Sequence, residues 1–209
     1  MLTIQGFNKS YQQHHVLSIE SLQLPPAIYF VKGENGSGKT TLFKCLAGIS
    51  PCQGEVTVHG VSMSKDAVGY RYQVNFAEAE PLFPSYLTAR DLMLFVGKTK
   101  SASPEQIDYY KESLGIDWFY DKSCGTYSSG MLKKLSLALA FLGDPKMIVL
   151  DEPLITLDEA TRKSLFQLIR EKSGTLFLIS SHQALEGAFP RAARHFKIQN
   201  KHLVAASDI

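Results

Sequence analysis

The sequence is poor in cysteine and has no long apolar run. Its three cysteines, Cys45, Cys52 and Cys124, are an odd number without C-x-x-C spacing, which argues against a disulfide framework and against a zinc site. We interpret them as small buried thiols. The longest apolar runs fall far short of the ~18 residues that a membrane-spanning helix needs, and the N-terminus lacks a signal-peptide pattern. We therefore expect a soluble protein made in the cytoplasm.

Neither sign of charge dominates. The 22 lysines and arginines and the 20 aspartates and glutamates give a formal net charge of +2, and they are mixed along the chain without long like-charged blocks. This pattern gives no footprint for nucleic acid or for an anionic membrane surface. A length of 209 residues with 44% hydrophobic residues suffices for one substantial core and a smaller inserted subdomain. No internal repeat is visible.

A glycine-rich loop between a strand and a helix is the strongest feature that is present. The segment Gly33–Thr40 reads G-E-N-G-S-G-K-T and follows the apolar run Ile28–Val31. Glycines let the backbone wrap a polyphosphate with its N–H groups pointing inward, and the following helix N-terminus attracts the same anion. We expect Lys39 to reach the β- and γ-phosphates and the Thr40 hydroxyl to hold Mg²⁺. The alternative is a glycine-rich turn with a solvated lysine.

The first half of the chain reads as strands followed by helices. Apolar and polar residues alternate from Leu2 to Leu24, as in half-buried antiparallel strands. Two further strands are predicted at Gly54–Gly60 and Val68–Tyr72, the second ending at Gln73. From about residue 80 to residue 125 the strand signals stop, which indicates an inserted helical subdomain. Its predicted helices are Thr88–Val96, Pro104–Leu114 and Ile116–Tyr120.

Strands and helices alternate again in the second half. A helix is expected from near Ser128 to Gly143, with Leu132, Leu135, Leu139 and Leu142 on one face. The apolar run Met147–Leu150 predicts a buried parallel strand that ends in an acidic pair. Asp158 is placed to cap the next helix, and the run Thr175–Ile179 predicts another buried strand.

Polar side chains follow several of these predicted strands. Ligands of a doubly wound sheet bind at the carboxyl ends of its strands, so we expect Lys39, Gln73, Asp151, Glu152 and His182 to meet at one edge. Asp151 suits Mg²⁺, Glu152 suits a general base, and Gln73 offers an amide to metal or water. His182 could donate to a γ-phosphate. Taken singly, Asp151 and Glu152 could also form a turn that simply ends a strand. Gln73 could be an exposed turn residue, and His182 could be a histidine that hydrogen-bonds only to its local surroundings.

Taken together, these residues resemble the ATP-binding-cassette (ABC) ATPases, the nucleotide-binding subunits of ABC transporters. The resemblance covers nearly the whole chain. Residues 33–41 match the Walker A motif and residues 150–153 match Walker B. Residues 127–131, Y-S-S-G-M, match the signature usually written L-S-G-G-Q, and residues 157–158 match the D-loop. Gln73 is matched to the Q-loop glutamine, His182 to the switch histidine and Tyr11 to the adenine-stacking aromatic, although an ordinary strand tyrosine is the alternative for Tyr11.

The resemblance implies a P-loop α/β fold with a mostly parallel core, an N-terminal antiparallel β subdomain and an inserted helical subdomain. Residues 1–79 and 126–209 would form the nucleotide-binding core, and about 80–125 the insertion. ATP and Mg²⁺ are the implied cofactors. The implied nucleotide contacts come from Tyr11, Gly33, Asn35, Gly36, Ser37, Gly38, Lys39, Thr40, Thr41, Ser128 and Gly130. The implied metal ligands are Thr40, Gln73 and Asp151, and the implied catalytic residues are Glu152, His182 and Gln73.

The chain also departs from the family pattern. Ser129 and Met131 replace glycine and glutamine in the signature, while Ser128 and Gly130 are kept. Signatures of the form Y-S-x-G-M are similar to those of short exporter-type ATPases. Ile155 and the following threonine precede the D-loop where small residues are usual, and the stretch from residue 74 to residue 80 looks long and acidic.

The resemblance further implies partners. Ser128 and Gly130 form a second anion site at a helix N-terminus without a second Walker lysine, so two copies would pack head to tail around ATP, most simply as a homodimer. The expected function is ATP hydrolysis that powers a separate transmembrane permease from the inner face of the cell membrane. The alternative is a soluble ABC-type ATPase of a non-transport cytoplasmic assembly, and a binding-only regulator with degenerate chemistry is a third possibility. The transported substrate and its direction are not encoded here.

Overall fold

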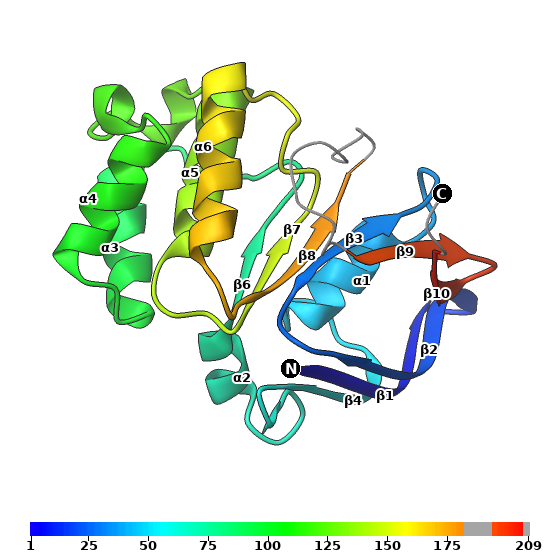
Figure 1. The fold of residues 1–209 in the computed structure, drawn as a ribbon. Helices are drawn as coiled ribbons and strands as arrows, with labels where there is room; N and C mark the ends of the chain where they lie inside the picture. Colours follow the sequence, from blue (N-terminus) through cyan, green and yellow to red (C-terminus); the bar gives the residue numbers. More distant parts are fainter. Residues whose placement is uncertain (182–193, 207–209) are drawn as a thin grey trace.

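The computed structural model describes residues 1–181 and 194–206 (Figure 1). Its strands are β1 (Leu2–Tyr11), β2 (His14–Leu24), β3 (Ile28–Lys32), β4 (Gln53–Val58), β5 (Val61–Ser62), β6 (Val74–Ala77), β7 (Met147–Leu150), β8 (Leu176–Ser180), β9 (Arg194–Gln199) and β10 (His202–Ala205). Its helices are α1 (Lys39–Leu46), α2 (Ala67–Gln73), α3 (Ala89–Thr99), α4 (Pro104–Ser113), α5 (Ser129–Phe141) and α6 (Glu159–Glu171). Two 3₁₀ turns, η1 (Asp117–Phe119) and η2 (Cys124–Thr126), follow α4.

The described strands form one sheet with an antiparallel and a parallel part. The strand order is β5-β4-β1-β2-β10-β9-β3-β8-β7-β6. Strands β1, β2, β4 and β5 pair antiparallel. Strands β1 and β2 pair from Leu2 opposite Leu24 to Tyr11 opposite His14, with a register shift between Lys9 and Ser10. The alternation of buried and exposed residues along β1 explains this arrangement, because one face covers the core and the other meets solvent. The predicted N-terminal antiparallel part is confirmed.

The parallel part brings the ends of several strands to one edge. Strands β9, β3, β8, β7 and β6 run parallel. Leu150 of β7 lies opposite Ile179 of β8 and Ala77 of β6, and Val31 of β3 lies opposite Ser180. The residues that follow β3, β6, β7 and β8 therefore meet at the same carboxyl edge of the sheet.

Two apolar cores lie on opposite faces of the sheet. In β8, Leu176 and Leu178 belong to the core around α1, whereas Phe177 and Ile179 belong to the core around α5 and α6. This alternation follows from the two-residue period of a strand. Figure 1 shows α1 on one side of the central strands and α3 to α6 on the other. The sheet thus separates α1 from α5, which pack on its two faces.

The region from residue 80 to residue 125 contains α3, α4 and the two 3₁₀ turns. Thr88 begins α3 with a capping box to Asp91, and Ser103 caps α4. The predicted third helix is only the 3₁₀ turn η1. Apolar residues of this region share one continuous core with α5 and the sheet. The boundaries at about 80 and 125 stay a prediction of domain organisation.

The predicted strand Val68–Tyr72 is wrong, because these residues lie in α2. Asp66 caps this helix by accepting the N–H of Gly69 at 2.8 Å. Tyr70 is fully buried, and its hydroxyl donates to the Leu46 carbonyl at the end of α1, at 2.6 Å. The helix therefore packs against α1, and the strand that enters the sheet is β6, which begins only at Val74.

Candidate nucleotide-binding site

The glycine loop connects β3 to α1 in a conformation that requires glycine. Gly36 and Gly38 have φ angles of 77° and 103°, a left-handed region that other residues adopt only at a cost. A Cβ on Gly33 would lie 2.5 Å from Ser37 Oγ. Gly38 also begins α1 by accepting the N–H of Leu42 at 2.8 Å. The loop therefore curls tightly over the N-terminus of α1.

Lys39 lies across this loop. Its ammonium donates to the carbonyl oxygens of Gly33, at 2.7 Å, and Glu34, at 3.0 Å. Burial lowers the pKa of Lys39, while the nearby carboxylates of Glu152 and Asp151 oppose that shift. Within the described residues, the buried Ser37 Oγ has no hydrogen-bond partner. A loop with a buried cation and an unsatisfied hydroxyl fits an oxyanion ligand such as a polyphosphate.

Asp151 joins the loop helix to the neighbouring strands. Thr40 Oγ1 donates to Asp151 Oδ2 at 2.7 Å, although 111 residues separate the two. Ser180 Oγ, at the end of β8, donates to Asp151 Oδ1 at 2.5 Å. Asp151 is buried. Hydroxyl groups therefore orient both of its carboxylate oxygens without competition from solvent. A hydroxyl beside a buried carboxylate is the oxygen-only donor pair that Mg²⁺ prefers.

Glu152 follows Asp151 with an unusual backbone. Its φ angle is +45°, in the region that residues with a side chain seldom occupy. Its buried N–H donates to Ser180 Oγ at 2.9 Å. Backbone strain of this kind often accompanies functional sites. Here it accompanies a carboxylate at the sheet edge.

These groups border one cavity of about 410 Å³, which we call the loop cavity. It is lined by Asn35, Gly36, Ser37, Gly38, Lys39, Thr40, Thr41, Ala79, Glu80, Asp151, Glu152 and Ile155. Three carboxylates border a space that also contains the anion-binding loop. A polyphosphate next to such carboxylates requires a divalent cation to offset the like charges. The residues therefore fit a nucleotide together with Mg²⁺.

Lys133 of α5 approaches the same edge from inside the protein. It is 1% exposed, and its ammonium donates to the carbonyl oxygens of Glu78, at 2.7 Å, and Asp151, at 3.4 Å. Burial lowers its pKa to about 8, and the surrounding acidic side chains oppose this shift. The local sequence pattern does not identify Lys133 as a site residue, because a lysine between leucines on a helix usually faces solvent.

Comparison with known proteins decides the family. Residues 21–155, well over half of the chain, match the family model described as ABC transporter. The chain belongs to the ABC transporter family. It is 34% identical over 178 residues to ABC transporter A family member 5 of Arabidopsis thaliana, covering 81% of this chain and 19% of that protein. It is 33% identical to YxlF of Bacillus subtilis strain 168, an uncharacterized ABC transporter ATP-binding protein, covering 87% of this chain and 62% of that one.

The chain thus spans about a fifth of the plant relative and less than two thirds of the bacterial relative. One similar solved structure is an ATP-binding cassette, described as dimeric, in a post-hydrolysis state with ADP and Pi. It superposes with a TM-score of 0.82 over 100% of both chains at 18% identity, which shows the fold. The predicted P-loop α/β fold, and the assignment to the ATP-binding domain of ABC ATPases, are confirmed.

The signature of this ABC domain lies away from the loop cavity of its own chain. Ser128 caps α5 by accepting the N–H of Met131 at 3.3 Å, and Met131 Sδ accepts the N–H of Ser128. Methionine therefore completes a capping box where the family has glutamine. A Cβ on Gly130 would lie 3.1 Å from the Thr156 carbonyl oxygen. Neither Ser128 nor Gly130 borders the loop cavity, so one chain does not bring them to its own nucleotide site.

Tyr11 lies at the tip of the β1–β2 hairpin. The residue is 52% exposed, and the ammonium of Lys9 lies 4.4 Å from the centre of its ring. The same hairpin reaches the loop through Val16, whose side chain would be 3.0 Å from a Cβ on Gly38. Tyr11 does not border the loop cavity, so its role as a base-stacking residue stays a prediction.

The predicted position of Gln73 is wrong. Gln73 is the last residue of α2, and its carbonyl accepts the N–H of Lys146, just before β7 begins. It therefore lies at the amino end of β6 and β7, about 15 Å from the carboxyl edge at 3.3 Å per residue. The residue that follows β6 at the carboxyl edge is Glu78, whose carboxylate pairs with Lys44 of α1 at 3.2 Å. The error came from placing the strand before Gln73 instead of after it.

His182 lies outside the described residues. The serine two positions before it, Ser180, was not among the predicted site residues, although it contacts both acidic residues of Walker B. Its position at the tip of the strand beside β7 is the signal that could have identified it. The carboxyl edge thus holds Lys39, Thr40, Asp151, Glu152 and Ser180 together.

Proposed function

We propose that this chain is the ATP-hydrolysing subunit of an ABC transporter and powers a separate membrane permease. The observation that carries the proposal is the 2.7 Å hydrogen bond between Thr40 and Asp151. It joins the start of α1, next to the phosphate-binding loop, to the carboxylate after β7, so that a metal and a polyphosphate could bind side by side.

The loop and α1 bind the triphosphate of ATP. Backbone N–H groups of the loop and the N-terminus of α1 surround the phosphates, and Lys39 exchanges its carbonyl partners for phosphate oxygens. Thr40 and Asp151 are the residues that would hold Mg²⁺. When bound, Mg²⁺ polarises the phosphoryl group and offsets the charge that develops on it.

Glu152 is the proposed general base. It follows the metal ligand directly, so its carboxylate can take a proton from a water that attacks the γ-phosphate. Ser180 supports this geometry by binding the Asp151 carboxylate and the Glu152 N–H. Glu80, on the segment after β6, borders the same cavity and adds negative charge there.

A second copy of the chain, or a similar subunit, completes the site. Ser128 and Gly130 stand at the N-terminus of a helix, yet they are separate from the loop cavity of their own chain. A head-to-tail pair would bring each signature to the nucleotide held by the other loop. The dimeric arrangement described for the similar cassette with ADP and Pi supports this proposal.

An apolar groove supports the permease as the further partner. This docking groove, about 530 Å³, is lined by Ala47, Ile49, Arg71, Val74, Asn75, Phe76, Glu78, Pro81, Leu82, Phe83, Val96, Lys100, Ser136 and Leu139. Leu82 is 88% exposed at its border, and Phe95 of α3 is 67% exposed. A contiguous apolar surface of this kind fits a protein partner. Within residues 1–181 and 194–206, no helix is long and apolar enough to cross a bilayer.

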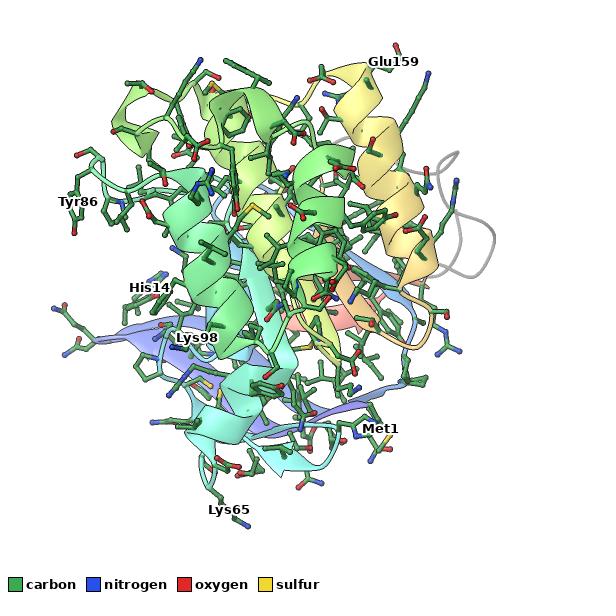
Figure 2. All side chains as sticks on the ribbon, turned by 90° about the vertical axis from the view of Figure 1, so that its left-hand side faces the viewer. Met1, His14, Lys65, Tyr86, Lys98 and Glu159 are labelled. Atoms are coloured by element: carbon green, nitrogen blue, oxygen red, sulfur yellow. The ribbon has the colours of Figure 1, made fainter. Side chains whose placement is uncertain are left out.

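The aromatic residues near this groove divide between the core and the surface. Phe119 is buried in the core, and Phe76 and Phe83 line the docking groove. Trp118 is exposed, and Tyr86 projects from the loop before α3 (Figure 2). The permease contact proposed here therefore centres on Leu82 and Phe83. Binding to the permease through this surface would place the chain at the inner face of the cell membrane.

The decisive experiment separates binding from hydrolysis. Glu152→Gln should keep ATP binding but lower phosphate release roughly 10²- to 10⁴-fold, and with ATP it should elute from gel filtration as a dimer. Lys39→Ala should lose roughly 10- to 100-fold in ATP affinity and remain a monomer. A Glu152→Gln protein that binds ATP and stays monomeric would contradict the paired arrangement.

The alternative, a soluble ATPase of a non-transport assembly, predicts a different partner. Solubilised membranes from cells that express the tagged chain should yield a protein with several membrane-spanning segments. Recovery of only water-soluble partners would favour the alternative.

A further inference from the structure

The peptide group between Asp151 and Glu152 is held at both of its ends. Its N–H donates to Ser180 Oγ at 2.9 Å, and its C=O accepts from the ammonium of Lys133 at 3.4 Å. Ser180 comes from β8 and Lys133 from α5. A neighbouring strand and a helix packed on the sheet therefore fix the orientation of this one peptide group.

That orientation matters because it accompanies the strained backbone of Glu152. A φ angle of +45° is unfavourable for a residue with a side chain and persists only where the surroundings hold it. If the peptide group rotated, Glu152 could return to an ordinary conformation, and its carboxylate would move away from the cavity. The contacts at the two ends of the peptide oppose that rotation.

Lys133 holds a second part of the same edge. Its shorter hydrogen bond, 2.7 Å, goes to the carbonyl of Glu78, which follows β6 and precedes two residues that line the loop cavity. A single buried ammonium thus connects the ends of β6 and β7 to the helix that begins at the signature. A buried charged side chain with so few partners is uncommon.

We propose that Lys133 is a positioning residue for ATP hydrolysis, because it holds the Asp151–Glu152 peptide in the orientation that presents the Glu152 carboxylate. This inference rests on the proposed role of Glu152 as general base. Lys133 lies on the protein side of the edge and does not border the loop cavity. It therefore acts through Glu152 and not on the nucleotide.

Lys172 provides a matched control. It is a half-buried lysine just after α6, and its ammonium donates to the backbone carbonyl of Gly143 at 3.0 Å. Gly143 follows α5 at the end away from the signature, and Lys172 borders neither the loop cavity nor the docking groove. Replacing either lysine removes an ammonium from a backbone carbonyl, but only Lys133 contacts the Walker B turn.

The experiment compares Lys133→Met with Lys172→Met in the full chain. Phosphate release and binding of a fluorescent ATP analogue are measured for both. Lys133→Met should lower kcat roughly 10- to 100-fold, as small misplacements of catalytic groups do, and should keep nucleotide affinity within about threefold. Lys172→Met should keep kcat within about threefold even if both variants melt at a similarly lowered temperature. Lys133→Arg, which can still donate to both carbonyls, should recover most of the lost turnover.

Equal kcat values for the two methionine variants would overturn the inference, as would a loss of affinity that accounts for the whole defect of Lys133→Met. If Lys133→Met does not fold, Lys133→Gln is compared with Lys172→Gln by the same criteria. The double variant Lys133→Met/Glu152→Gln distinguishes this inference from the proposed function. Turnover no lower than that of Glu152→Gln alone shows that Lys133 acts through Glu152, and multiplied losses contradict it. Full activity of Glu152→Gln alone would instead refute the proposed base.

Discussion

Ser180 Oγ lies 2.5 Å from Asp151 Oδ1 and also accepts the N–H of Glu152. One hydroxyl at the end of β8 thus contacts both acidic residues at the end of β7. The parallel register, in which Leu150 lies opposite Ile179, sets this contact. The geometry of the acidic pair therefore depends on a neighbouring strand as much as on its own.

Replacing Ser180 with alanine tests that dependence. Ser180→Ala leaves the buried Glu152 N–H without its acceptor and Asp151 without one donor, which should cost about 1–3 kcal/mol of unfolding free energy. The melting temperature should fall by roughly 3–10 °C, and kcat should fall with it. Differential scanning fluorimetry and phosphate release measure both. Ser64→Ala, which removes an exposed hydroxyl bound to Glu55, serves as the control, and equal melting temperatures for the two variants would argue against the role of Ser180.

Removing the Thr40 hydroxyl tests the metal site. Thr40→Val keeps the shape of the side chain but loses the oxygen that contacts Asp151. ATP affinity in Mg²⁺ should fall roughly 10-fold, whereas affinity in excess EDTA should change less than about twofold. Isothermal titration calorimetry in the two buffers measures the difference. An equal loss in both buffers would assign Thr40 to phosphate binding and not to the metal.

The pH dependence of stability should report on Lys100. Burial lowers its pKa to about 8 in the folded chain, against about 10.4 in the unfolded chain. Below pH 8 both states carry the proton. Between about pH 8 and 10.4 the unfolded state binds more protons, so the unfolding free energy should rise with pH.

Because Lys100 is partly exposed, this gain should be only about 1 kcal/mol and not the full linkage value. Lys100→Met removes it, so the difference in stability between wild type and variant should shift in favour of wild type as pH rises from 8 to 10. Urea unfolding at several pH values measures this difference. A difference that is constant with pH would show that Lys100 keeps its ordinary pKa.

A charge in the docking groove should weaken partner binding without affecting catalysis. Leu82→Glu changes an 88% exposed side chain, so folding and the ATPase rate of the isolated chain should be unchanged. Co-purification with the permease should drop roughly 10-fold or more, because the interface would have to bury a carboxylate. Val204→Glu on β10, across the molecule from α3 (Figure 1), is the control. Equal recovery of the permease with both variants would show that the permease binds at another surface.

Local sequence patterns predicted much of the fold, because the burial of apolar residues determines where most strands and helices lie. Met147–Leu150 was assigned as a strand with the observed bounds, since a short apolar run between Pro145 and an acidic pair has few other solutions. Helix α5 was also predicted, but its buried face was not. Leu132 and Leu139 are only half-buried, whereas Lys133 is enclosed, because the helix contacts protein on more than one side.

The errors concern segments that distant contacts decide. The alternation around Tyr70 resembles a strand, yet its hydroxyl binds the end of α1 and the residues form a helix. The true strand, β6, has only four residues, and one of them is Asn75. Its side-chain amide is buried and donates to the carbonyls of Ala140 and Leu142 at the end of α5. Such partners lie some 65 residues away and cannot be read from the local pattern.

The short segment after β6 lies between the docking groove and the loop cavity and lines both. Glu78 borders the docking groove, whereas the next two residues, Ala79 and Glu80, border the loop cavity. Successive Cα atoms are held ~3.8 Å apart by the covalent chain, so a ligand that displaces Glu78 from one side also pulls on the residues that face the other. A docked partner and a bound nucleotide could therefore affect each other directly, because the three residues 78–80 line both binding sites.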